Sequence, residues 1–205
     1  FLPANESRYF FPLSTKPMIT MIASRGCPFD CVYCGLPNKH SFQTRSISNI
    51  IKEIKANIQK GYEYIDIKDD IFTYDMSRIE NLCSSIIDER IKFNWGCETR
   101  VDFLTEKLVS LMKAAGCSNI KLGIESSVKS VQQAIGKVIN IDRIKSSFRM
   151  IRRHGMYVIA YFSLGHPGET LSDMKQTVQN IAKLKPDYMD VTLCSPIPGS
   201  RLFKI

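Results

Sequence analysis

Short apolar runs alternate with stretches of helical periodicity along almost the whole chain. In residues 47–58 the isoleucines recur at the three- and four-residue spacing of one helical face, and similar spacings follow the later apolar runs. The pattern predicts five helices. It also predicts six strands, at residues 19–24, 64–68, 93–98, 119–125, 157–165 and 188–194.

Local signals mark where several helices begin and end. Thr105 and Thr170 each stand immediately before a helical stretch, where a hydroxyl can accept a hydrogen bond from a free backbone N–H. Gly61, Gly116 and Gly155 end three of the helices just before a strand, as a left-handed C-terminal cap requires. These signals support the division of the chain into alternating elements.

Strands that alternate with helices favour an α/β fold with a parallel sheet and right-handed crossovers. Two arrangements satisfy this pattern, an open doubly wound sheet and a barrel. A complete barrel of eight strand–helix units needs about 250 residues, and this chain has 205. We therefore expect a parallel six-stranded partial (β/α)6 barrel, which is a partial TIM barrel.

Composition narrows the class of protein. Hydrophobic residues make up 44% of the chain, which excludes a disordered protein. No run approaches the roughly 18 apolar residues of a membrane span, so we expect no such span. The first seventeen residues contain charges and prolines where a secretory signal is apolar. With seven cysteines and no such signal, we expect a cytoplasmic, reducing location in which thiols serve metals or the core.

The formal charge of +8 comes from Lys and Arg residues that are scattered through the helical stretches. Scattered cations are typical of a solvated surface. A basic surface permits an anionic substrate, RNA or an acidic redox partner but requires none of them, so nucleic acid is not a required partner. Because the chain lacks an initial Met and ends without a tail, we expect it to be part of a longer polypeptide.

Polar residues follow each predicted strand, at the ends where parallel α/β folds place their chemistry. A single strand end turns polar simply because it reaches water, but so many together favour an active site. The residues at these exits are Arg25, Gly26, Cys27, Lys68, Asp69, Asp70, Glu98, Thr99, Arg100, Glu125, Ser126, the segment 165–169 and Cys194.

Cys27, Cys31 and Cys34 form a C-x₃-C-x₂-C arrangement after the first predicted strand. Three thiolates this close suit a soft-metal centre, either an iron–sulfur cluster or zinc. A structural zinc site needs four ligands, usually in two pairs, whereas no second C-x₂-C pair is present and His40 stands at a non-standard spacing. Three ligands leave one iron of a [4Fe–4S] cluster open for chemistry. A zinc site completed from afar and three unrelated core thiols are the alternatives.

The other cysteines fall into two groups. Cys83 lies on an apolar helix face, and Cys97 and Cys117 lie within or beside strands, so we expect all three in the core. Cys194 stands at the last strand exit, near the expected mouth of the site, where an exposed thiol can be reactive.

The three-cysteine arrangement, with Tyr33 before the third cysteine, resembles the hallmark of radical S-adenosylmethionine (SAM) enzymes. The resemblance extends through the segments YIDIKDDIFTYD, WGCETRVDFLTEKLVSLMKAAGC, LGIES, FSLGHPGET and SPIPGSRLF. These are similar to the core of radical SAM enzymes that often follow a cobalamin-binding domain, and to methylthiotransferases and coproporphyrinogen oxidase-like enzymes. Residues 1–17 resemble the linker from that upstream domain, and residues 18–205 resemble the radical SAM core domain.

The resemblance implies that Cys27, Cys31 and Cys34 hold a [4Fe–4S] cluster whose open iron binds SAM. Reductive cleavage of SAM then gives a 5′-deoxyadenosyl radical that abstracts a hydrogen from the substrate. Tyr33 packs against the cluster in such enzymes, with its backbone near the adenine. An upstream domain is expected to bind cobalamin as a further cofactor.

The resemblance also assigns residues to SAM. Two adjacent acids, Asp69 and Asp70, fall where the family has a Gly-Gly-Glu-like motif that contacts the SAM amino group, and either of them can make this contact. The guanidinium of Arg100, after the third predicted strand, suits the SAM carboxylate. The alternative role for Arg100 is an ion pair with Glu98 or Asp102. Glu125 and Ser126, after the fourth predicted strand, fall where the family contacts the ribose hydroxyls. For Ser126 the alternative role is a helix N-cap. The expected SAM-binding residues are Asp69, Asp70, Arg100, Glu125, Ser126, Ser163 and Gly165.

The expected function is that of a radical SAM enzyme, performing cobalamin-dependent methylation or a radical rearrangement. A cobalamin-independent radical SAM enzyme, either an oxidoreductase or methylthiotransferase-like, is the first alternative. A non-catalytic iron–sulfur or zinc protein is the second. The resemblance implies a small-molecule or peptide substrate and a reductant such as flavodoxin or ferredoxin.

Overall fold

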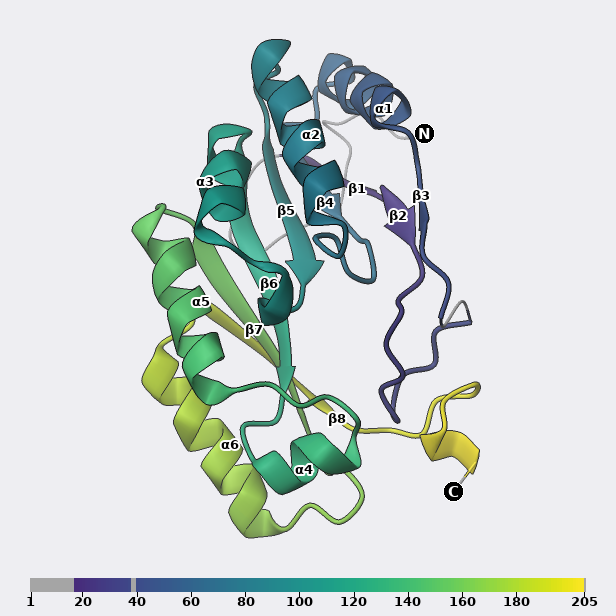
Figure 1. Cartoon of the computed structure of the whole chain (residues 1–205), viewed down its shortest axis with the longest axis vertical. Helices are drawn as coiled ribbons and strands as arrows, with labels where there is room; N and C mark the ends of the chain where they lie inside the picture. The colour runs from purple at the N-terminus through teal and green to yellow at the C-terminus, as the bar shows by residue number, and fades with distance from the viewer. Residues whose placement is uncertain (1–16, 38–39, 205) are drawn as a thin grey trace.

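Six parallel strands form one curved sheet in the computed structural model, which describes residues 17–37 and 40–204. Their order across the sheet is their order along the chain, so each strand pairs with the next (Figure 1). The strands are β1 (Met18–Met21), β4 (Tyr64–Ile67), β5 (Asn94–Thr99), β6 (Cys117–Glu125), β7 (Tyr157–Leu164) and β8 (Tyr188–Leu193). The parallel six-stranded sheet predicted from the sequence is confirmed.

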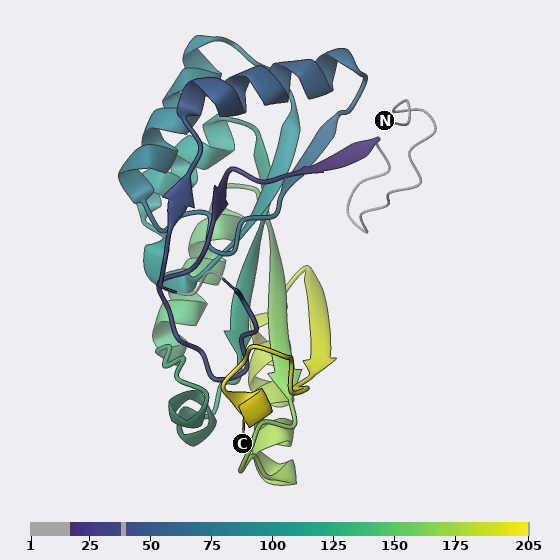
Figure 2. The ribbon, with the colours of Figure 1, turned by 90° about the vertical axis from the view of Figure 1, so that its right-hand side faces the viewer.

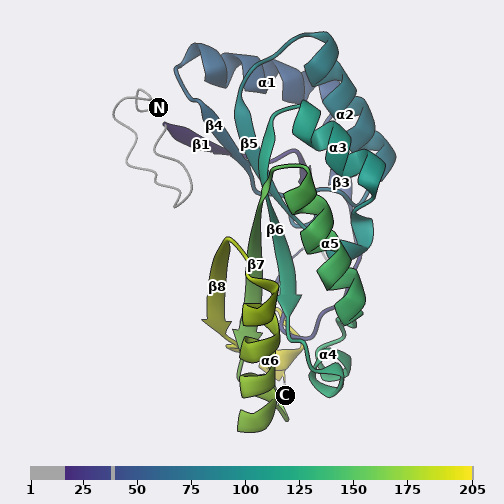
Figure 3. The same ribbon diagram turned by 90° about the vertical axis from the view of Figure 1, so that its left-hand side faces the viewer.

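The long helices all lie on the outer face of this sheet (Figures 1 and 3). A doubly wound fold has helices on both faces, so the partial barrel is confirmed over that alternative. The helices are α1 (Ile47–Gln59), α2 (Met76–Asp88), α3 (Glu106–Ala114), α4 (Lys129–Ala134), α5 (Ile141–Arg153) and α6 (Leu171–Leu184). Two short 3-10 helices, η2 (Val101–Phe103) and η3 (Leu202–Lys204), complete the described elements. The sequence pattern missed only α4 among the α-helices, because its six residues are too few to show a helical period.

The predicted helix boundaries are confirmed. The hydroxyl of Thr105 accepts a hydrogen bond from the Leu108 N–H, and Thr170 forms a capping box with Asp173 at the start of α6. Gly116 has a φ of 93°, in the left-handed region, and an added Cβ would lie 2.4 Å from the Phe93 carbonyl oxygen. Glycine is therefore required where α3 turns back into β6.

The first predicted strand, residues 19–24, is wrong in its second half. β1 ends at Met21, and the chain then leaves the sheet to form β2 (Ser24–Arg25), which pairs antiparallel with β3 (Gln43–Thr44). The cause is Asp69, whose carboxylate accepts hydrogen bonds from the Ala23 N–H at 2.6 Å and the Ser24 hydroxyl at 2.5 Å. These bonds replace sheet pairing and turn the chain toward the segment that carries the three cysteines.

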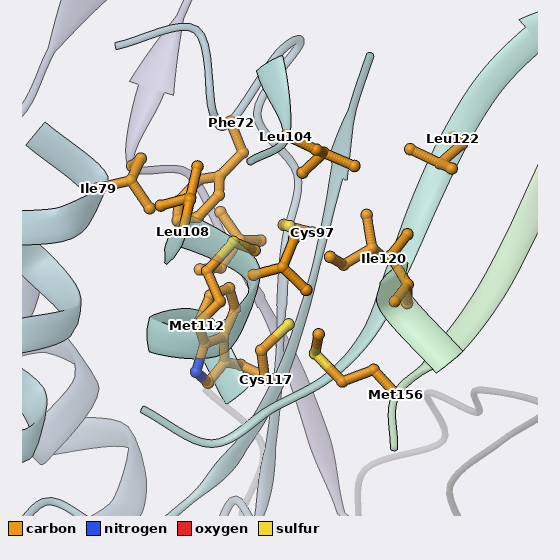
Figure 4. Close-up of a cluster of buried hydrophobic side chains, with 14 of the residues drawn as sticks. Phe72, Ile79, Cys97, Leu104, Leu108, Met112, Cys117, Ile120, Leu122 and Met156 are labelled. Atoms are coloured by element: carbon orange, nitrogen blue, oxygen red, sulfur yellow. The ribbon is translucent and has the colours of Figure 1, made fainter. Parts of the chain in front are cut away.

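The core lies between the sheet and the outer helices (Figure 4). Cys83, Cys97 and Cys117 are buried in it, as predicted, and each is a free thiol. Trp95 is also buried, and its indole N–H donates to the Ala115 carbonyl at 2.8 Å.

The predicted linker, residues 1–17, lies outside the described residues except for Pro17. No helix in the described part of the chain is long and apolar enough to cross a membrane. The opposite, inner face of the sheet forms the lumen of the partial barrel, and the carboxyl ends of the strands carry the site.

Candidate functional site

The loop between β2 and β3 carries the three clustered cysteines, and backbone hydrogen bonds at Val32 hold it in place. The Val32 N–H donates to the Ile135 carbonyl at 2.9 Å, and the Leu202 N–H donates to the Val32 carbonyl at 3.0 Å. The loop therefore lies beside the end of α4 and the C-terminal segment (Figure 2). Gly35 permits this approach, because an added Cβ would lie 2.8 Å from Ile197.

A cavity of about 190 Å³ lies at the carboxyl ends of the strands, and Cys27, Cys31 and Cys34 all line it. Residues from the exits of β4, β5 and β6, together with Tyr161 from within β7, line its other sides. The structure thus brings the cysteine loop against most of the strand exits that the sequence singled out. Further lining residues are Phe29, Tyr33, Asp70, Glu98, Arg100, Lys121, Gly123, Glu125, Lys137 and Tyr161.

The three cysteines are a donor set that suits an iron–sulfur cluster. All three are free thiols that line one cavity, and thiolates are the ligands that hold such clusters. Burial, together with the neighbouring Cys31 and Cys34, raises the pKa of Cys27. The chemistry of these donors therefore fits an iron–sulfur centre.

Glu125, at the end of β6, is the best-held acid of the cavity. Its carboxylate accepts hydrogen bonds from the Lys137 ammonium at 2.8 Å, the Ser163 hydroxyl at 3.2 Å and the Tyr33 hydroxyl. Burial acts to raise the pKa of Glu125, but Lys137 and these hydrogen bonds outweigh burial and hold the pKa below 4.5. Glu125 is therefore an anion at neutral pH, and its φ of 64° sets it apart from regular strand geometry.

The two adjacent acids after β4 have different environments. Asp70 is exposed, lines the cavity and accepts a hydrogen bond from the Gly26 N–H at 2.8 Å. Asp69 is buried beneath the loop, holds Ala23 and Ser24, and does not line the cavity. Burial raises the pKa of Asp69, although the hydrogen bonds from Ser24 oppose this. The structure places Asp70, and not Asp69, where a ligand can be met.

Arg100 lines the cavity and is held in place on both sides. Its guanidinium carbon lies 4.1 Å from the centre of the Phe29 ring, a cation–π contact. Its Nε and Nη2 both donate to one oxygen of Asp102, at 3.0 and 2.7 Å. The predicted ion pair with Asp102 is therefore present, and it positions the guanidinium at the cavity.

Three of the predicted residues do not line the cavity. The Ser126 hydroxyl is fully buried, contacts Thr177 at 3.0 Å and accepts from the Val128 N–H, so it supports the turn into α4. Ser163 is buried between Glu125 and His166. Gly165 is exposed and has open space where a Cβ would be added.

The model of the Radical SAM superfamily matches residues 21–181, which include the cysteine loop and five of the six sheet strands in part or whole. The chain belongs to the radical SAM superfamily. The family that the cysteine arrangement and the matching sequence segments resemble is therefore confirmed.

Several relatives of this radical SAM chain are described as methyltransferases or cyclases. An uncharacterized methyltransferase of Pyrococcus horikoshii is 30% identical over 92% of the chain and 42% of the relative. The anaerobic magnesium-protoporphyrin IX monomethyl ester cyclase of Rubrivivax gelatinosus is 26% identical over 97% of the chain and 36% of the relative. The chain thus spans about two fifths of the length of these relatives.

The fold also matches a solved radical SAM methyltransferase. TsrM from Kitasatospora setae, whose structure contains cobalamin and a [4Fe–4S] cluster, superimposes with a TM-score of 0.85. Its sequence is 17% identical, and the match covers 91% of this chain and 38% of TsrM. At this identity the likeness establishes the fold.

The sequence missed several residues of the radical SAM cavity. Lys137 lies in the loop after α4 and reaches back to Glu125, and nothing in its local sequence distinguishes it from a surface lysine. Gly123 leaves room for this pair, because an added Cβ would lie 2.8 Å from the Lys137 ammonium. Lys121 and Tyr161 face the lumen because they alternate with core residues along β6 and β7. That alternation was the available signal.

A charged network, here called the floor network, extends from two residues that line the cavity, Glu98 and Lys121, to Asp66 and Lys68. Lys121 is 1% exposed in its side chain and forms an ion pair with Asp66. Lys68 lies 3.2 Å from Asp66 and 2.7 Å from Glu98, which is 3.8 Å from Lys121. Burial lowers the pKa of Lys121, although Asp66 opposes this. Two lysines and two acids alternate in this network, so its formal charges cancel.

Proposed function

We propose that this chain is the catalytic core of a cobalamin-associated radical SAM enzyme that performs methylation or a radical rearrangement. The observation that carries the proposal is that Cys27, Cys31 and Cys34 line one cavity together with Asp70, Arg100 and Glu125. The cavity therefore holds both thiolates, which are soft ligands for iron, and carboxylates, which attract a cation. A cluster and a cationic cosubstrate need such a combination.

Each lining residue has a role in this proposal. The three cysteines hold a [4Fe–4S] cluster, which when bound supplies the electron that cleaves SAM to the 5′-deoxyadenosyl radical. Asp70 meets the SAM ammonium, and Arg100 meets its carboxylate. Glu125 accepts from the ribose hydroxyls, while Lys137, Tyr33 and Ser163 hold its carboxylate still. Gly165 lets the backbone approach the adenine.

The remaining predicted residues support this site from behind. Asp69 shapes the cysteine loop, and Ser126 supports the turn after Glu125. The core residues 18–205 follow a linker at 1–17 in this proposal. Flavodoxin or ferredoxin delivers the electron in the cytoplasm, and the substrate is a small molecule or peptide.

The known proteins that resemble this chain are the reason that cobalamin is part of the proposal. The TsrM structure holds cobalamin, and the Pyrococcus horikoshii relative is described as an uncharacterized methyltransferase. A cobalamin-independent enzyme is the second candidate, because the tRNA-2-methylthio-N(6)-dimethylallyladenosine synthase of Buchnera aphidicola is 27% identical over 97% of this chain and 48% of that relative. Cobalamin content of the full-length protein, read from its absorption spectrum after purification, separates the two.

The direct test is anaerobic reconstitution with iron and sulfide, followed by SAM and dithionite. We expect about four irons per chain and production of 5′-deoxyadenosine. Cys27→Ala, Cys31→Ala and Cys34→Ala each lose the iron and the product. Tight zinc binding without iron–sulfur absorption would refute the proposal.

A further inference from the structure

A second and larger cavity opens at the edge of the barrel, beside the cysteine-lined one. Its volume is about 600 Å³, and none of its lining residues lines the first cavity. β1 and the residue after it contribute Thr20 and Ile22, and the β2–β3 hairpin contributes Arg25, Gln43 and Thr44. This volume is in the range of cavities that enclose a small organic molecule.

The lining combines an apolar surface with an excess of positive charge. Ile22 is 38% exposed and offers its side chain to the cavity. Glu53 is the one acid of the lining, and Arg45 already pairs with it at 2.5 Å. Within the described residues, the Arg25 guanidinium has neither an ion pair nor a side-chain hydrogen bond. An exposed apolar surface beside an unengaged guanidinium suits an organic anion.

The cavity adjoins the cysteine-lined site through two connections. Lys68 lines the second cavity, and its ammonium lies 2.7 Å from Glu98, which lines the first. Arg25 directly precedes Gly26, whose N–H is held by Asp70 of the first cavity. A molecule in the second cavity is therefore separated from the first by the Lys68–Glu98 ion pair.

We propose that this second cavity binds the anionic portion of the substrate, a carboxylate or phosphate group carried on an apolar organic body. The anion is held by Arg25, and the body lies against Ile22. The reacting part extends past Lys68 toward the cysteine-lined cavity. This inference rests on the proposed function, since it assigns the substrate class of the same site.

The molecule offers a matched control for this proposal. A groove between α5 and α6 has the same volume of about 600 Å³ and is lined by Lys145, Arg149, Arg152 and Lys183. Arg149 is exposed there, like Arg25, and its guanidinium has no hydrogen bond or ion pair within the described residues. If anions bind merely because the protein is basic, this groove should take them as readily.

The experiment titrates the cluster-loaded protein with 1-naphthyl phosphate, 1-naphthoate and neutral 1-naphthol, and follows naphthalene fluorescence. We expect saturable binding of at least one anion, and binding of 1-naphthol at least about tenfold weaker, because a charged hydrogen bond is lost. Arg25→Gln should weaken anion binding by about tenfold or more, Arg25→Lys by less, and Arg149→Gln not at all. Preference for the phosphate or the carboxylate identifies the anionic group.

Unchanged anion binding in Arg25→Gln, equal binding of 1-naphthol, or loss of binding in Arg149→Gln would each overturn the inference. Circular dichroism of each variant confirms that the fold is retained, and Arg25→Lys serves if the Gln variant does not fold. The parent protein's yield of 5′-deoxyadenosine is measured separately. No product refutes the proposed function, whereas product without Arg25-dependent anion binding refutes only this inference.

Discussion

The Lys137 ammonium lies 2.8 Å from Oε1 of Glu125, and both side chains are largely buried, at 8% and 14% exposure. This pair joins the loop after α4 to the end of β6, at the wall of the cysteine-lined cavity. Burial of a carboxylate is costly unless a partner compensates it. Lys137 is thus the reason that Glu125 remains charged where it lines the cavity.

Lys137→Met should destabilise the protein in a pH-dependent way. Removing one partner of a buried pair costs about 3–5 kcal/mol. The pKa of Glu125 is held below its unfolded value of 4.5, so its contribution to stability is present above pH 4.5 and lost as pH falls through the lower, folded pKa. The loss should therefore be larger at pH 7 than at pH 4.

Urea unfolding followed by fluorescence of Trp95, the single tryptophan, measures this loss. Lys129→Met removes an exposed lysine from neighbouring α4 and serves as the control. A loss in Lys137→Met no larger than in Lys129→Met, or equal losses at the two pH values, would contradict the role given to the pair.

A second prediction separates ligand thiols from core thiols by the same substitution at two buried sites. Cys97→Ser should keep its iron after reconstitution and lose about 1–3 kcal/mol of unfolding free energy, because a hydroxyl replaces a thiol in the core. Cys31→Ser should lose the cluster. Iron analysis and urea unfolding of both variants provide the comparison, and loss of iron in Cys97→Ser would show that the ligand assignment is wrong.

The floor network leads to a third prediction. Asp66→Asn removes the carboxylate that Lys121 touches and should cost about 3–5 kcal/mol at pH 7. Because the folded pKa of Lys121 is already lowered, the unfolded chain binds more protons and stability rises with pH toward 10.5. The cost should therefore shrink at pH 9.5.

The double variant Asp66→Leu with Lys121→Met tests whether the pair itself is needed for stability. Replacing both charges with apolar groups of similar volume is often neutral. We expect its urea midpoint to lie much closer to that of the parent than the single variant's midpoint does. A double variant as unstable as Asp66→Asn would show that the floor needs its charges for more than mutual compensation.

Sequence reasoning succeeded where the signal is local. The helical period of α1, the caps at Thr105 and Thr170, and the spacing of Cys27, Cys31 and Cys34 each lie within a few residues. These signals predict the order of elements and the cysteine loop without any knowledge of packing. The parallel sheet then follows from alternation alone.

The rest depends on contacts between distant residues. The bend after Met21 exists because Asp69, some 46 positions along from Ala23, accepts hydrogen bonds from this segment. Lys137 reaches Glu125 across a helix that shows no period. Asp69 and Asp70 are adjacent, and only the packed structure decides which carboxylate turns inward and which faces the cavity.

The last prediction concerns these two acids. Asp70→Asn should leave iron content intact and weaken SAM binding, because the variant keeps its size but loses a charged hydrogen bond worth about 1.5–3 kcal/mol, or about 10- to 150-fold in affinity. Asp69→Asn should leave SAM affinity near that of the parent and lower stability instead, because an amide cannot accept from both the Ala23 N–H and the Ser24 hydroxyl as the carboxylate does. Asp187→Asn, beside the start of β8 at the opposite end of the barrel, is the control and should change neither iron content nor SAM affinity. SAM titrations of the reconstituted variants, with urea unfolding in parallel, decide the matter. If Asp69→Asn weakened SAM binding while Asp70→Asn did not, the carboxylate that faces the cavity would not be the one that meets the cosubstrate.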